Sequence, residues 1–421
     1  MPRARPSKLA TADFTFPTGV PKMAASMIAR EQIIYLDNNA TTQLDPAVIE
    51  EMLPFLTEYY GNPSSGYTFG RQVRRAIDLA RERVAALLGC EPREVVFTSC
   101  GTESNNAAVN SALQLTPSRQ HVVTTAVEHS ATRRHCETVA KRGCVVTVVG
   151  VDGDGNLDLE ELERAITPQT AIVTAMWANN ETGVLFPVEK IAEIARRKRV
   201  LFHTDAIQTV GKIPIRLADS TINSLALSAH KLHGPKGVGA LYVSKRSAFK
   251  PLVIGGSQEN NRRAGTENVA SIVALGKAAE CAGAALAEEN SRVRAMRNRF
   301  ESGLLERIPN TFVNGDVAAR LPNTTNVSFA GIESDAALVM FDRHQLCCSA
   351  GSACRTGSLE SSHVLRAMNL PAERTRGSMR FSFGRFNTDA DVDRALEIIP
   401  AVISKLRALA PANIAREPAA V

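Results

Sequence analysis

The chain has 421 residues, of which 44% are hydrophobic and 22% charged, and this composition is ordinary for a folded protein of about two domains. No apolar run comes near the roughly 20 residues that cross a membrane, and a net charge of +6 without a concentrated basic face argues against nucleic-acid binding. The eight cysteines form no C-x-x-C pair, and without a secretory signal they predict neither a disulfide framework nor a zinc site.

The first thirty residues differ from the rest of the chain. Their basic residues outnumber the single acidic residue Asp13, and they contain prolines and show no periodicity. This pattern predicts a disordered N-terminal extension over residues 1–30. Two other interpretations stay open: a start placed too early, with Met23 or Met27 as the true first residue, and a basic targeting segment.

From residue 31 to about residue 285, short apolar runs alternate with amphipathic stretches. The stretch 73–88 places apolar residues such as Val73, Ile77 and Val84 at helical spacing. Its arginines, Arg81 included, are expected to form a solvated face. The alternation favours one large domain, a mostly parallel sheet with helices on both faces. The runs interpreted as buried strands are residues 95–97, 121–123, 145–147 and 171–173.

After residue 265 the order of elements changes. An alanine-rich and charged stretch at 268–308 predicts a long helix that leads into a smaller C-terminal domain, residues 286–421. Strands are expected near residues 326–329, 346–348 and 379–383, with helices between them. The predicted fold class is therefore α/β, with a large domain followed by a smaller α+β domain.

A turn of small residues, TSCGTES at positions 98–104, follows the first of these strands. Gly101 and Thr102 stand where the turn enters a helix, so free backbone N–H groups and the helix dipole would attract an anion there. The hydroxyls of Thr102 and Ser104 add donors. An ordinary capped helix start remains the alternative interpretation.

Asp205 ends another apolar strand, in the sequence FHTDAIQ at positions 202–208. Ligands of open α/β sheets bind at the carboxyl ends of the strands, so this carboxylate is well placed to act on a ligand. A buried aspartate that only caps a turn is equally consistent with the pattern.

Lys231 follows a predicted strand and precedes a Gly/Pro turn, in LSAHKLHGPKGVG at positions 227–239. Small and apolar neighbours would keep the amine from water, which lowers the pKa of a lysine and allows a Schiff base with a carbonyl cofactor. His230 and His233 could indicate a metal, but no further ligand cluster accompanies them.

Cys354 lies in a run of small residues, SAGSACRTGS at positions 349–358. Such a run predicts a loop that carries one thiol, and Arg355 beside it would favour the reactive thiolate. The alternative is an incidental cysteine in a loop.

Together these segments resemble the NifS/IscS-type cysteine desulfurases of the class-V aminotransferase family over residues 33–410. The exact sequences of the motifs are more similar to the nitrogen-fixation NifS branch than to the housekeeping branch. The resemblance implies the pyridoxal-phosphate-dependent transferase fold (fold type I) and pyridoxal 5'-phosphate as the cofactor. The motifs that carry it are YLDNNATT (35–42), GNPSS (61–65), FTSCGTES (97–104), WANNETG (177–183), HTDA (203–206), HK (230–231), GPKG (234–237), RAGTEN (263–268) and GSAC (351–354).

The resemblance also implies a role for each matching residue. Lys231 would carry the cofactor covalently, Asp205 would pair with its ring nitrogen, and His129 would stack on its ring and act in catalysis. Arg380 would bind the substrate carboxylate, and Cys354 would receive the sulfur. The other implied residues are Asn180 and Gln208 at the ring hydroxyl, Asn180 also toward the substrate, Gly101, Thr102, Ser228 and His230 at the phosphate, and Thr266 reaching the phosphate of a partner subunit.

The implied function is a cytoplasmic, homodimeric cysteine desulfurase, which converts L-cysteine to L-alanine and leaves a persulfide on Cys354. The implied partner is an iron–sulfur scaffold or another sulfur acceptor, in nitrogenase or housekeeping cluster assembly, with Cys354 as a ligand of a [2Fe–2S] cluster shared with a scaffold protein. Two alternatives remain: another class-V enzyme, such as a selenocysteine lyase or an aminotransferase, and a non-catalytic iron–sulfur carrier that uses Cys347, Cys348 and Cys354.

Overall fold

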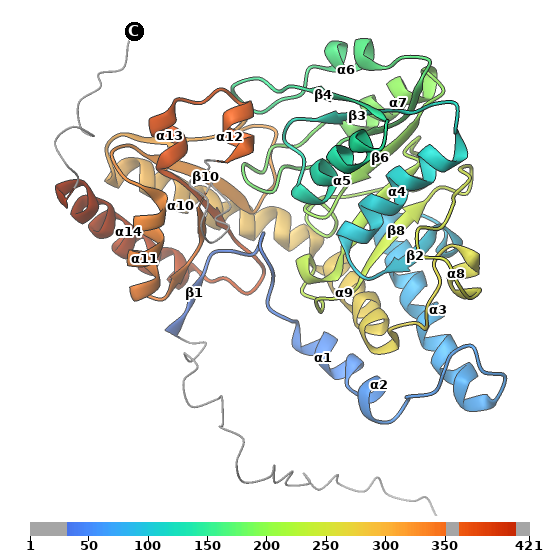
Figure 1. The fold of residues 1–421 in the computed structure, drawn as a ribbon. Coiled ribbons are helices and arrows are strands. Elements are labelled where there is room, and N and C mark those ends of the chain that lie inside the picture. Colours follow the sequence, from blue (N-terminus) through green and yellow to red (C-terminus); the bar gives the residue numbers. More distant parts are fainter. Residues whose placement is uncertain (1–31, 351–361, 410–421) are drawn as a thin grey trace, which may run out of the picture. The chain divides into compact units, whose positions relative to one another are not determined.

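A seven-stranded sheet forms the centre of the larger part of the fold in the computed structural model, which describes residues 32–350 and 362–409 (Figure 1). Its strand order is β2-β8-β7-β6-β5-β3-β4. Neighbouring strands run parallel except β8, which is antiparallel to both β2 and β7. The prediction of a mostly parallel sheet is confirmed. The four predicted strands are β2 (Val95–Thr98), β3 (His121–Thr125), β4 (Val145–Val149) and β5 (Thr170–Thr174), joined by β6 (Leu201–Asp205), β7 (Ser224–Ser228) and β8 (Gly239–Val243). The predicted burial of residues 145–147 is wrong, because β4 lies at the edge of the sheet and Val145 is 62% exposed.

Apolar side chains leave this sheet on both faces, because successive residues of a strand point to opposite sides. In β2, Val95 and Phe97 join the large core with residues of α3 and α7, whereas Val96 packs with Ala107 and Ala108 of α4 on the other face. Helices therefore cover both faces, as predicted. The covering helices are α3 (Thr68–Leu88), α4 (Gly101–Leu115), α5 (Ser130–Lys141), α6 (Leu159–Ala165) and α7 (Val188–Arg197).

Helix α3 confirms the predicted periodicity but corrects one detail. Arg81 was expected on a solvated face, yet it is only 8% exposed and donates two hydrogen bonds of 2.7 Å to the carboxylate of Glu259. The reason is its position, four residues after Ile77 and three before Val84, which places it on the buried face of the helix. Its charge is tolerated there because a bidentate carboxylate partner satisfies it.

The long helix predicted for residues 268–308 is present as a run of three segments: α9 (Val269–Glu288), a π-helical turn (Glu289–Val293) and α10 (Arg294–Arg307). By length and composition this run could cross a membrane, which corrects the statement that no apolar stretch comes near that length. Its most apolar window is 56% buried inside the protein, and α9 packs against α1 and α3. A core helix passes the same test of length and hydropathy.

A four-stranded antiparallel sheet of order β12-β13-β10-β9 forms the second centre of the fold, and α10 and α14 pack with it around a separate core. Phenylalanines such as Phe300, Phe329 and Phe381 fill this core. The expected smaller α+β part is thus present, although the boundary near residue 285 stays a prediction. Its strands are β9 (Thr311–Val313), β10 (Thr324–Phe329), β12 (Ser349–Ala350) and β13 (Ser378–Ser382), with helices α11 (Ser334–Arg343), α12 (His363–Ala367), α13 (Ala372–Arg376) and α14 (Asp389–Leu409).

Two segments far apart in sequence pair beside this second core. Strand β1 (Ile34–Tyr35) runs parallel to β11 (Leu346–Cys347), and Ile34 and Leu36 join the second core. The chain then leads through α1 (Pro46–Met52) and α2 (Pro54–Thr57) to α3, so its N-terminal part contributes to both centres. The short helix α8 (Gln258–Asn261) precedes α9.

Candidate active site

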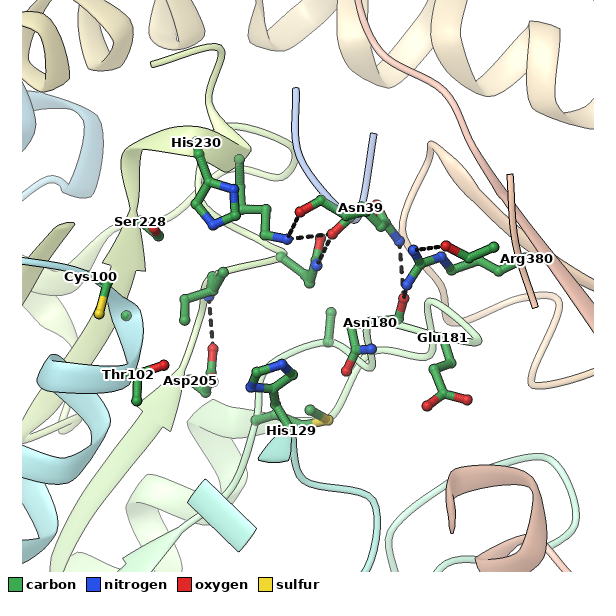
Figure 2. A pocket seen from close by; sticks show the side chains of 18 of the residues that line it. Asn39, Cys100, Thr102, His129, Asn180, Glu181, Asp205, Ser228, His230 and Arg380 are labelled. Carbon is green, nitrogen blue, oxygen red and sulfur yellow. Dashed lines mark hydrogen bonds between the residues drawn. The ribbon is translucent and has the colours of Figure 1, made fainter. Parts of the chain in front are cut away.

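A cavity of about 450 Å³ opens where β6 and β7 end, where α4 begins, and where β12 and β13 approach from the second sheet (Figure 2). This is the carboxyl edge of the parallel strands, the usual ligand position in open α/β sheets. Ten of the residues predicted from the sequence line it together: Gly101, Thr102, His129, Asn180, Asp205, Gln208, Ser228, His230, Lys231 and Arg380.

Lys231 stands in a 3-10 turn (Ala229–Lys231) directly after β7. Its Nζ donates to the backbone oxygens of Asn39, at 2.5 Å, and Ala40, at 2.6 Å. Burial lowers the pKa of Lys231 to about 7, assisted by the positive charges of Lys212 and Arg380. Near neutral pH a substantial share of this amine is therefore an uncharged nucleophile, as predicted from its small and apolar neighbours.

Asp205 ends β6 and is held by two donors. Its Oδ2 accepts from the side chain of Asn105 at 2.7 Å, and its Oδ1 accepts from the backbone N–H of Ile207 at 3.0 Å. Burial raises the pKa of Asp205, while the neighbouring His129 opposes that shift. A buried carboxylate at this place would gain from a positively charged partner in the cavity.

A relay of hydrogen bonds orients Asn105. Burial lowers the pKa of His203 to about 3, so its ring is neutral. Its Nε2 lies 2.9 Å from Asn105 Oδ1, an acceptor, so the ring proton is on Nε2, and Nδ1 accepts from the hydroxyl of Ser224 at 2.9 Å. The Asp205 carboxylate only accepts, so Asn105 turns its Nδ2 toward Asp205 and its Oδ1 toward the histidine.

The N-terminus of α4 forms one end of the cavity. Cys100 caps this 15-residue helix without a side-chain hydrogen bond among the described residues, so first-turn N–H groups are left for a ligand. A Cβ atom at Gly101 would meet Ile207 Cδ1 at 2.0 Å, so a larger residue there would force the Ile207 side chain to move. Thr102, Ser228 and the neutral His230 lie beside the same end, and an anion fits it.

His129 begins α5, and its ring lines the cavity floor opposite Asn39 in Figure 2. Its Nδ1 accepts from the N–H of Ala131 at 3.2 Å, so the proton of the neutral ring is on Nε2. Burial lowers the pKa of His129, and the negative charge of the Asp205 carboxylate opposes that shift.

Arg380, on β13, lies at the other end of the cavity from Thr102 and Cys100 (Figure 2). It donates to Asp37 Oδ1 at 2.7 Å, to the Ser349 hydroxyl at 2.9 Å and to the backbone oxygen of Asn180 at 2.9 Å. Its Nε is buried without a partner among the described residues. The two ends of the cavity thus suit two anionic groups, one held by α4 and one by a guanidinium.

Several residues of the site were given no role from the sequence. Asn39 supplies one of the carbonyls that accept from Lys231, and its side chain donates to the backbone oxygen of Asn180, which also accepts from Arg380. Asn105 reaches Asp205 from α4. Glu181, with a pKa raised by burial to about 7, lines the cavity and accepts a hydrogen bond from Ser362. The only signal for Asn39 and Glu181 was their place inside the quoted motifs DNNATT and WANNETG.

Three further sequence predictions have different outcomes. Thr266 is exposed and lines a separate cavity of about 200 Å³ with Ser99 and Arg263, so it is not part of this chain's own site. Cys354 lies outside the described residues. Within residues 32–350 and 362–409, no group of three or more His, Cys, Asp or Glu side chains could hold a metal ion.

These side chains fit pyridoxal phosphate. The group carries an aldehyde, a phosphate and a basic ring nitrogen, and the cavity offers a lysine of lowered pKa, an uncapped helix start and a buried carboxylate. The fit depends only on the hydrogen-bond donors and the charges of these described side chains and backbone groups.

Comparisons with known proteins agree with this chemistry. The family model described as aminotransferase class-V matches residues 34–395. A cysteine desulfurase from Trichormus variabilis is 53% identical over 379 residues, which are 90% of this chain and 95% of the relative. The cysteine desulfurase NifS of Azotobacter vinelandii is 48% identical over 90% of this chain and 94% of its own length. A solved NifS-like protein is 37% identical, with a TM-score of 0.83 over 88% of this chain and 99% of that structure.

Proposed function

The chain belongs to the cysteine desulfurases of the class-V aminotransferase family, and we propose that it converts L-cysteine to L-alanine and leaves the sulfur as a persulfide on Cys354. The observation that carries the proposal is the cavity that joins Lys231, Asp205 and the uncapped start of α4. The relatives favour this reaction over the alternative of a non-catalytic iron–sulfur carrier.

Pyridoxal phosphate, when bound, withdraws electrons from the α-carbon of an attached amino acid and so weakens the bonds around it. Lys231 would hold the cofactor covalently. Gly101, Thr102, Ser228 and His230 would hold its phosphate, and Asn180 and Gln208 would lie at its ring hydroxyl. Asp205 would pair with the ring nitrogen and keep it protonated, which favours electron withdrawal. His129 would cover one face of the ring.

Lys231 and Arg380 act on the substrate in this proposal. Arg380 would bind the cysteine carboxylate as a fork, and it is already held in place by Asp37 and Ser349. Asn180 would assist at the same end of the cavity. The Lys231 amine, whose pKa of about 7 lets it accept and return a proton near neutral pH, is placed to move the α-proton of the substrate.

Cys354 would supply the second nucleophile. Its thiolate would attack the substrate sulfur, and the Cβ–S bond would break with its electron pair left on Cβ. Cβ would then take up a proton, so that alanine leaves and the sulfur remains on Cys354 as a persulfide. The described residues on either side support delivery to the cavity. Ser349, before the Cys354 segment, bonds to Arg380, and Ser362, after it, bonds to the cavity residue Glu181.

We infer a homodimer. Exposed apolar side chains lie along α1, α2 and the segment that leads to α3. Among them, Tyr60 is 80% exposed and Leu56 is 60% exposed. A patch of this kind usually marks a protein interface. Thr266 of one subunit would then complete the phosphate site of the other. This arrangement agrees with its position outside its own chain's cavity.

The persulfide would pass by thiol exchange to an acceptor in the cytoplasm, and we propose a scaffold for iron–sulfur clusters, including those of nitrogenase. The Azotobacter relative, a cysteine desulfurase named NifS, supports the release of sulfur from cysteine that this role requires. Cys354 could share a [2Fe–2S] cluster with the scaffold during transfer. The burial of α9 supports a protein that works outside a membrane.

Alanine formation from cysteine by the purified, cofactor-loaded protein tests the proposed function. Wild type should form alanine, and Lys231→Ala should form none and lose the visible absorbance of the covalently held cofactor. Lys190→Met, a change at an exposed lysine, is the matched control and should behave as wild type. Alanine formation by Lys231→Ala would overturn the assignment.

A further inference from the structure

Lys212 is a second buried lysine at this site, 6% exposed, and it stands behind the cavity wall rather than in it. Its Nζ donates to the backbone oxygen and to the side-chain Oε1 of Gln208, both at 3.1 Å. Burial lowers the pKa of Lys212 to about 8, while Glu289 raises it and Arg380 lowers it. A buried lysine costs stability, so its contacts call for an explanation.

Pairing with Glu289 does not supply that explanation. Glu289 pairs with Arg385, whose Nε lies 3.5 Å from Glu289 Oε1, and no hydrogen bond or ion pair joins Lys212 Nζ to Glu289 within the described residues. The partner that Lys212 does bond is Gln208, a residue of the cavity wall.

The hydrogen bonds of Gln208 determine which way its amide points. An ammonium group only donates and a backbone carbonyl only accepts. Gln208 turns Oε1 toward Lys212 and donates from Nε2 to the backbone oxygen of Asn39 at 3.0 Å. If the amide turned over, its NH₂ group would face the Lys212 ammonium, which is also a donor. Its oxygen would face the Asn39 carbonyl oxygen, which is also an acceptor. The second N–H of Gln208 has no partner among the described residues, and Gln208 lines the cavity, so this N–H is available to a ligand there.

We propose that Lys212 is a positioning residue, which locks the Gln208 amide so that the cavity receives an N–H donor for the ring oxygen of the cofactor. This inference rests on the proposed function and deepens it. Without Lys212, only the Asn39 carbonyl would hold the Gln208 amide in this direction. An amide that turned would present its oxygen, which repels the charged ring oxygen that it must stabilise.

The same network reaches the catalytic lysine. The Asn39 backbone oxygen accepts from Gln208 Nε2 and also from Lys231 Nζ. Lys212, Gln208, Asn39 and Lys231 therefore form one continuous chain of hydrogen bonds. A change at Lys212 can reach the site through this chain, or directly through its positive charge.

The test is a spectroscopic pH titration of bound pyridoxal phosphate in four proteins: wild type, Lys212→Met, Gln208→Leu and the double variant. Without the donor, the ring oxygen keeps more negative charge and holds the proton of the lysine–cofactor linkage more tightly. The pH midpoint of the visible band should rise by roughly one unit in each single variant. The double variant should show no further rise, because both changes remove the same donor. Lys212→Arg, which keeps the donor, should restore a midpoint near that of wild type.

Three results would overturn the inference. A Lys212→Met protein with a wild-type midpoint and only a lower melting temperature would show a purely structural lysine. A further shift from Lys212→Met in the Gln208→Leu background would show that the charge acts directly. Failure of Lys212→Arg to restore the midpoint would exclude the donor role. If wild type shows no cofactor absorbance at all, the proposed function fails and the inference falls with it.

Discussion

The carboxylate of Asp205 is held by the side-chain amide of Asn105, which stands 100 positions earlier in the chain and donates from Nδ2 to Oδ2 over 2.7 Å. The amide oxygen of Asn105 accepts in turn from the neutral ring of His203 at 2.9 Å. Asp205 is therefore a carboxylate held from two sides at the wall of the cavity.

Asp205→Asn should leave cofactor binding intact and lower turnover by several orders of magnitude. The amide keeps the size of the side chain but cannot hold a protonated ring nitrogen by charge. Cofactor absorbance and alanine formation are the two measurements. A rate near that of wild type would show that Asp205 serves only the fold.

Asn105→Ala should lower turnover about 10-fold, because the Asp205 carboxylate loses one of its two hydrogen-bond donors and keeps only the backbone N–H of Ile207. The pKa of Asp205, already raised by burial, should rise further without the Asn105 donor. The acid limb of the pH–rate profile should therefore lie at a higher pH in this variant than in wild type. Asn110→Ala is the matched control, since among the described residues the Asn110 side chain bonds only to the backbone of its own helix. Equal profiles for the two variants would contradict this account.

Cofactor loading should depend on pH through Lys231. Since its pKa is about 7, below the ordinary lysine value, the amine is charged below pH 7 and uncharged above it. The rate at which apoprotein binds pyridoxal phosphate should rise about 10-fold per pH unit below that midpoint and then level off. Glu181, whose pKa is also about 7, is the competing group, so Glu181→Gln should keep the midpoint. A midpoint near 10, or one that moves with Glu181, would contradict the assignment to Lys231.

Wild type should be a dimer in light scattering, and Leu56→Glu should weaken it, because a charge would be buried in the proposed interface. Val148→Glu changes another exposed apolar residue, on the strand β4 at the sheet edge, and should leave the dimer intact. An active wild-type monomer would refute the proposed interface. Equal loss of dimer in the two variants would also contradict it.

Local sequence patterns predicted much of this molecule. Lys231 could be found because it comes shortly after an apolar strand, Asp205 because it ends one, and Gly101 because a small turn precedes a helix. These are relations between neighbouring residues. The long helix and the mostly parallel sheet were visible for the same reason.

Contacts between distant segments could not be read in this way. Asn39 reaches Lys231 across 192 positions, and the antiparallel direction of β8 depends on how the chain returns to the sheet. Arg81 was misassigned because a charged residue on a helix usually faces water, and its buried partner Glu259 lies 178 positions away. Lys212 had no motif at all, and only its contacts with Gln208 indicate a role.

The central claim is that sulfur leaves cysteine for Cys354. Its most direct test is a single turnover with isotopically labelled cysteine, followed by mass spectrometry of the peptide that contains Cys354. Wild type should form one alanine per active site and carry one labelled sulfur atom on Cys354. Cys354→Ala should bind cofactor and cysteine, because Lys231, Asp205 and Arg380 are unchanged, but it should release no alanine. Labelled sulfur on a different cysteine, or alanine formed by Cys354→Ala at the wild-type rate, would contradict the account.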